Sequence, residues 1–213
     1  WKLKSMYSSI PASLLFWTIP FLFTPATERS AYLSGQSYAE FSEFKMGLRP
    51  AKNFGLELEN RRLADFGQQS FAASTGISLH EHICFDAGLQ FIRSFQSSAS
   101  HTQVHVNTSL LFSQELTQSL VYVSLHPARK SFEFKAAHLY ELDPQWRLGM
   151  EWDSKSDALQ ILTHYTTDRV ILTFSLAPEY QRLGFALKYQ QLWIQIALNT
   201  GSTINAPVFL GQW

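Results

Sequence analysis

The sequence predicts an all-β fold, a closed antiparallel transmembrane β-barrel of about 14 strands, with 12 as the alternative, joined by short loops. Three observations predict it. Apolar residues recur at every second position in one segment after another, these segments have the length of membrane-crossing strands, and the composition is poor in charge and rich in aromatic residues. We expect residues 1–213 to form a single barrel domain.

The alternation is the clearest signal, because successive residues of a strand point to opposite faces of the sheet. Phe71, Ala73, Thr75, Ile77 and Leu79, for example, alternate with small or polar residues. Turn-forming dipeptides such as Arg49-Pro50, His126-Pro127 and Asp143-Pro144 separate the segments. The predicted strands cover residues 53–59, 70–79, 83–91, 103–112, 132–141, 145–153, 159–165, 170–176, 182–189 and 191–199, with a last segment at 204–213.

The composition agrees with a barrel that faces lipid. Charged residues make up 16% of the chain and aromatic residues 15%, whereas about 25% of the residues in a typical soluble domain are charged. A helical membrane protein is excluded, because each span needs about 20 apolar residues. The longest apolar stretch, Leu14–Phe23, has ten residues and contains Pro20.

Alternation alone does not say which face of the sheet is outside. A soluble barrel also alternates, with its apolar face inward. Here the face opposite the apolar one is rich in Ser, Gly, Ala, Thr, Gln and Asn, and aromatic residues fall near strand ends, which favours lipid outside. The expected interfacial aromatics are Phe85, Phe91, Tyr140, Trp146, Trp152 and Trp213, and a terminal aromatic such as the last is similar to the assembly signal of outer-membrane barrels.

The beginning of the chain is open to three interpretations. The first residue is Trp1 rather than Met, so we expect a processed or truncated start. Lys2, Lys4 and the apolar stretch Leu14–Phe23 loosely resemble a signal peptide. The same stretch could be a first apolar strand, or residues 1–30 could form a plug.

No sequence motif indicates an enzyme, a cofactor or a metal. There is no Gly-x-Ser-x-Gly, phosphate loop or dinucleotide fingerprint, and the single cysteine, Cys84, cannot form an intramolecular disulfide. His80-Glu81-His82 is the nearest approach to a metal motif, and we expect it to be a polar turn. A net charge of zero excludes the basic footprint of a nucleic-acid-binding protein.

Charged residues occur on the polar face and would point into the lumen if lipid is outside. Both signs are present in nearly equal number, which favours internal salt bridges that fill the lumen, with a polar conduit as the alternative. The candidate lumen-facing residues are Glu57, Glu59, Asp86, Glu133, Lys135, Glu141, Arg147, Glu151, Arg182 and Lys188.

Two short segments resemble a known family. Ile10-Pro11-Ala12-Ser13-Leu14 is similar to the Asn-Pro-Ala-x-Leu segment of the PorV/PorQ-like barrels of Bacteroidetes-type bacteria, which are related to the FadL barrels, with Ile10 in place of Asn. Leu183-Gly184-Phe185-Ala186-Leu187 and the segment to Trp213 are similar to the closing strands of that family. The resemblance implies a 14-strand barrel that serves type IX protein secretion as a shuttle or partner.

We therefore expect a non-enzymatic barrel of the bacterial outer membrane that is an accessory subunit or partner of a larger envelope complex. Its expected partners are outer-membrane lipid and other outer-membrane or periplasmic proteins, and not nucleic acid. One alternative is a stand-alone transport barrel for small hydrophobic or polar solutes. Another is a soluble lipid-binding β-barrel.

Overall fold

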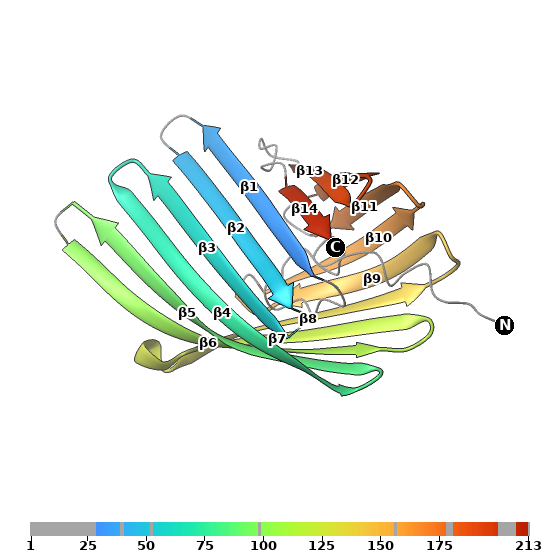
Figure 1. Cartoon of the computed structure of the whole chain (residues 1–213), viewed down its shortest axis with the longest axis horizontal. Helices are drawn as coiled ribbons and strands as arrows, with labels where there is room; N and C mark the ends of the chain where they lie inside the picture. Colours follow the sequence, from blue (N-terminus) through green and yellow to red (C-terminus); the bar gives the residue numbers. More distant parts are fainter. Residues whose placement is uncertain are drawn as a thin grey trace.

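The structure is a computed structural model, and it describes residues 29–38, 41–51, 53–97, 99–155, 157–177, 181–199 and 208–212. Within these ranges the chain forms one antiparallel sheet and a single short 3-10 turn, η3 (Pro127–Arg129) (Figure 1). The strands are β1 (Ser30–Tyr38), β2 (Phe41–Ala51), β3 (Phe54–Leu63), β4 (Phe66–His80), β5 (Ile83–Gln96), β6 (Ala99–Ser113), β7 (Thr117–His126), β8 (Ser131–Glu141), β9 (Trp146–Asp153), β10 (Ala158–Thr166), β11 (Val170–Leu176), β12 (Gln181–Tyr189), β13 (Leu192–Asn199) and β14 (Val208–Gln212).

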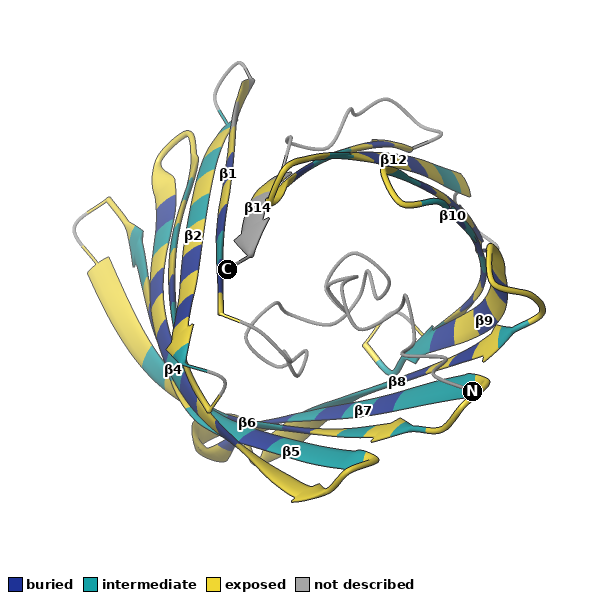
Figure 2. Ribbon diagram, turned by 45° about the vertical axis from the view of Figure 1, so that its right-hand side comes forward, coloured by how far each residue is buried: buried dark blue, intermediate teal, exposed yellow. Residues whose placement is uncertain are grey.

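Each strand pairs with the next one along the chain, and β1 also pairs with β14. At this seam Ser30–Ser34 lie opposite Val208–Gln212, so the described strands form a ring (Figure 2). The predicted all-β antiparallel fold is confirmed. The strand number of the whole chain stays a prediction, because several segments, including Ile10–Phe23 and Trp213, lie outside the described residues. No helix among the described residues is long and apolar enough to cross a membrane.

One predicted break is wrong. Arg49-Pro50 was expected to end a segment, but β2 continues to Ala51. Pairing between β2 and β3 shifts between Leu48 and Ala51. Proline is tolerated at such irregular positions, because no ladder hydrogen bond from its nitrogen is needed there.

The two faces of the sheet differ sharply in character. On β12, for example, Leu183, Phe185 and Leu187 are exposed, whereas Gly184 and Ala186 between them are buried. The exposed face is apolar on most strands, and the buried face carries most of the polar side chains. A water-soluble barrel would place its apolar face inside, so this arrangement fits a sheet surrounded by lipid.

The two ends of the ring differ, because the first strand begins and the last strand ends at the same one. β1 begins at Ser30 and β14 ends at Gln212 on the same side, here called the terminal end. The opposite side, here called the far end, carries the β1–β2 turn and every second connection after it. Connections at the terminal end have two to four residues. The longest connection, between Asn199 and Val208, joins two strands at the far end.

Candidate functional site: the polar inner wall

The inward face of the sheet is the candidate functional site. All ten charged residues expected to face the lumen lie on this face, on β3, β5, β8, β9 and β12, in alternation with exposed apolar residues. Asp86, Arg147 and Glu151 are almost completely buried. Most of the others are half-buried, so the wall is lined with charge that is largely withdrawn from water.

Near the far end, β2 and β3 carry a tight cluster of charges. The Glu43 carboxylate accepts hydrogen bonds from Nε and Nη2 of Arg61 at 3.0 and 2.6 Å. Lys45 lies 3.3 Å from Glu43 and 3.5 Å from Glu59, and Arg61 also lies 3.0 Å from Glu59. Each acid therefore contacts two basic groups, and the cluster has no excess of either sign.

A second, deeper ion pair joins strands that are not neighbours. Arg49 of β2 and Asp86 of β5 lie 3.7 Å apart and are 1% and 3% exposed, with β3 and β4 between them. Gly76 makes this possible, because a Cβ at that position would lie 2.2 Å from Oδ1 of Asp86. The glycine thus leaves the sheet surface flat enough for a charged side chain to lie on it.

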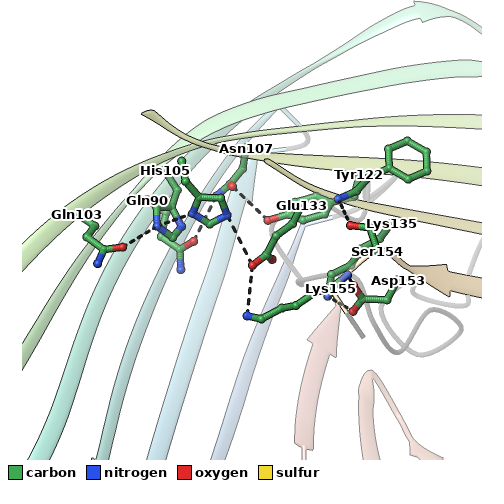
Figure 3. Close-up of polar contacts among 12 residues, drawn as sticks. Gln90, Gln103, His105, Asn107, Tyr122, Glu133, Lys135, Asp153, Ser154 and Lys155 are labelled. Carbon is green, nitrogen blue, oxygen red and sulfur yellow. Dashed lines mark hydrogen bonds and ion pairs between the residues drawn. The ribbon is translucent and has the colours of Figure 1, made fainter. Parts of the chain in front are cut away.

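The middle of the wall carries a chain of hydrogen bonds across β4–β7. Tyr122 donates to the Asn107 side chain at 3.1 Å, and Asn107 donates to Gln90 at 3.3 Å. Gln90 in turn donates to Ser70 at 3.5 Å. Figure 3 shows Gln90, Asn107 and Tyr122 pointing toward one another from adjacent strands. Asn107 is completely buried, so its hydrogen bonds replace those it would make to water.

Two histidines extend this chain toward the far end. His126 Nδ1 and His105 Nε2 form a hydrogen bond of 2.9 Å, and Gln103 contacts the same nitrogen of His105 at 3.4 Å. His126 Nε2 lies 3.6 Å from Glu133, which also contacts Lys155 at 3.2 Å (Figure 3). The histidines were not singled out by the sequence, because their closeness depends on the β6–β7 register.

Further ion pairs continue along β8 and β9. Lys135 lies 3.1 Å from Asp153, near the far end. Arg147 lies 3.8 Å from Glu141, near the terminal end. Lys188 of β12 lies above the ring of Trp193, 5.5 Å from its centroid. Charged and polar groups therefore run from one end of the wall to the other.

Part of the inner wall is apolar. Leu120, Leu139, Leu162, Ile171 and Trp193 are buried on the inward face between β7 and β13. Leu139 packs over Gly149 of β9, where a Cβ would lie 2.4 Å from the leucine Cδ2. Small residues, namely Ala137, Ala186 and Ala197, lie among them. Apolar side chains are thus interspersed with polar ones on β7–β13, whereas the inward face of β2–β6 is mainly polar.

The aromatics expected at the interfaces lie on the outward face. Phe91, Tyr140 and Trp146 are exposed, and Phe85 and Trp152 are half-buried. Trp146 pairs with Tyr165, their ring centroids 4.9 Å apart, at the terminal end. Trp152 pairs with Phe134 at 5.6 Å, closer to the far end. Two levels of aromatics are thus present on this side, while Trp213 lies outside the described residues.

The described residues contain no complete catalytic or metal-binding arrangement. His80 ends β4, and Glu81 and His82 form the exposed turn to β5. No group of three or more potential metal ligands occurs in the part of the chain that the structure describes. On the outward face, Ser119 Oγ and His138 Nδ1 form a 2.8 Å hydrogen bond. No described carboxylate contacts that histidine, so the pair satisfies two polar groups in an apolar surface rather than forming a triad.

Comparison with known proteins establishes the fold. No protein-family model matches the sequence, and no curated protein is similar to it. Among solved structures, a FadL homologue from Pseudomonas aeruginosa is similar with a TM-score of 0.61 and 9% identity, covering 98% of this chain and 93% of that one. The KdgM porin in complex with disordered oligogalacturonate has a TM-score of 0.50 and 10% identity, covering 86% and 99%. The chain thus has the fold of bacterial outer-membrane β-barrels.

Proposed function

We propose that this chain is a transport barrel of the outer membrane that lets small solutes pass along its inner wall. The observation that carries the proposal is the continuous set of polar and charged side chains from the far-end cluster around Glu43 to the Arg147–Glu141 pair at the terminal end. A barrel with a purely structural role needs only an apolar outer face. A polar inner wall gives solutes hydrogen-bonding partners in place of water.

The balance of charge on the inner wall indicates the class of solute. Acidic and basic groups contact one another along the wall, so we propose no strong preference for cations or anions. Small neutral or zwitterionic molecules are therefore the proposed substrates. Because most inward side chains are buried, we expect slow passage compared with a wide porin.

Transport is favoured over the accessory role that the sequence predicts. The solved structures compared above are a porin and a FadL homologue, and neither the PorV/PorQ family nor a role in secretion gains support from them. That accessory role and the envelope partners it implies stay predictions. Recovery of large secretion components in a detergent pull-down from the native source would support them.

The test of the transport proposal is ion selectivity measured in planar bilayers. Purified barrel under a salt gradient should show discrete channel openings and a reversal potential close to zero. Lys135→Gln leaves Asp153 without its basic partner on the inner wall and should shift the reversal potential toward cation selectivity. Lys130→Gln, in the exposed turn after η3, is the matched control and should leave selectivity unchanged. A complete absence of openings, or equal effects of the two variants, would contradict the proposal.

A further inference from the structure

The outward face of β3–β6 carries a sharp boundary between apolar and polar residues near the far end. The last apolar row of paired residues runs across all four strands, and the next row is entirely polar. The apolar row is Leu58, Phe71, Phe91 and Val104, and the polar row is Asn60, Gln69, Arg93 and Thr102. β4, β5 and β6 have 15, 14 and 15 residues, so they continue past this boundary. Such a boundary marks the edge of the hydrocarbon layer.

Two arginines lie at and just above this boundary. Arg93 belongs to the polar row, and Arg62 lies one row further toward the far end, opposite Gly67. Both side chains are exposed, and neither makes an ion pair or hydrogen bond with any residue in the described ranges. From strand and residue spacings their Cα atoms are about 12 Å apart. Their charge is therefore available to a group outside the protein.

The lengths of the connections place this end in the outer leaflet. Outer-membrane barrels have short turns on the periplasmic side and longer connections outside. The longest connection here, between Asn199 and Val208, is at the far end.

We propose that Arg62 and Arg93, with the polar row beside them, form a binding site for the phosphates of lipid A, the lipid anchor of outer-leaflet lipopolysaccharide. A guanidinium can donate two parallel hydrogen bonds to a phosphate. Gln69 is paired with both Asn60 and Arg93, and Thr102 is paired with Arg93 on its other side, so these side chains supply further donors for headgroup oxygens. The acyl chains would lie on the apolar row beneath, against Phe71 and Phe91.

Phe95 helps to shape this surface. It pairs with Gly67, where a Cβ would lie 2.0 Å from the Phe95 ring, so the ring covers the glycine, which is paired with Arg62 on its other side. An aromatic ring at the level of the headgroups, beside arginines, is the usual composition of a membrane interface. The site depends on the barrel spanning the membrane and not on transport, so its test is a binding measurement.

The experiment measures binding of fluorescently labelled diphosphoryl lipid A to the folded, detergent-solubilised full chain by anisotropy. The charge-removing variant is Arg62→Gln with Arg93→Gln. The control, Arg129→Gln with Lys130→Gln, removes the same charge from an exposed turn at the same end. Each lost charge-assisted contact should weaken binding about tenfold. We expect at least that loss in the first variant and less than about threefold in the control.

Three outcomes would overturn the site. Equal weakening in both variants would mean that only net charge matters. Unchanged binding in the Arg62 and Arg93 variant would mean that lipid A binds elsewhere or not specifically. Inorganic phosphate that competes as effectively as lipid A would mean a free-anion site and not a lipid site. Circular dichroism of each variant establishes that the strands are intact, so that a loss of binding is not a loss of fold.

Discussion

The substitution Asp86→Asn should destabilise the barrel more than the loss of any exposed charge. Arg49 and Asp86 lie 3.7 Å apart and are nearly inaccessible to solvent. At an effective dielectric constant of about 20, two unit charges at that separation attract by roughly 4–5 kcal/mol. The introduced amide would keep some hydrogen bonding to the guanidinium, so we expect Asp86→Asn to cost about 2–3 kcal/mol.

The measurement is urea unfolding in phospholipid vesicles, followed by tryptophan fluorescence. Arg61→Gln is the control, since Arg61 is 40% exposed and belongs to a screened cluster. Its expected cost is at most about 1 kcal/mol. A cost for Asp86→Asn no greater than that of the control would refute the idea that burial strengthens this pair.

Gly76 provides an independent probe of the same contact. Alanine there would place a Cβ 2.2 Å from Oδ1 of Asp86 and push the carboxylate off the sheet. We expect Gly76→Ala to cost about 1–3 kcal/mol. Because both changes disturb one ion pair, the variant with Gly76→Ala and Asp86→Asn should cost less than the two single costs together. Additive costs would mean that the glycine acts through something else.

Two further predictions test the lipid-facing surface and the seam. Ile161→Arg, in the exposed apolar face of β10, should lower the free energy of unfolding in vesicles by about 2–4 kcal/mol. Thr102→Arg, above the apolar boundary, should lower it by less than about 1 kcal/mol. Equal losses would contradict the boundary. Leu33→Cys with Phe209→Cys, in a Cys84→Ser background, should form a disulfide on oxidation, seen as altered gel mobility after denaturation, because the two residues are paired across β1 and β14. Failure to cross-link would contradict the closed ring.

Much of the fold can be read from the sequence because the pattern is local. The segment around Leu183–Leu187 alternates cleanly and is found as β12. The alternation does not predict β7, because Leu120 and Tyr122 are buried inside while Val121 and Val123 lie outside, so both faces are apolar. It does not predict β1 for the opposite reason. Its sequence is mostly small and polar, and Leu33 is its main apolar outward residue.

The site was predictable only as a set of charges. Alternation assigns Asp86, Arg147 and Glu151 to the inward face, and all three are buried there. It does not say that Arg49 contacts Asp86, because that contact bridges two intervening strands and depends on the register of three pairings. The closeness of His105 and His126 has the same origin. Register is set by turns and side-chain packing across strands, neither of which is visible in a single strand.

The central claim, that this chain is a transport barrel, is tested most directly by solute uptake into proteoliposomes. Vesicles that contain the folded barrel should take up a small neutral sugar and a zwitterionic amino acid faster than vesicles without protein. Vesicles with heat-denatured barrel should be no faster than empty ones. Uptake by the folded barrel that equals that of empty vesicles, with the protein shown to be inserted, would contradict the account.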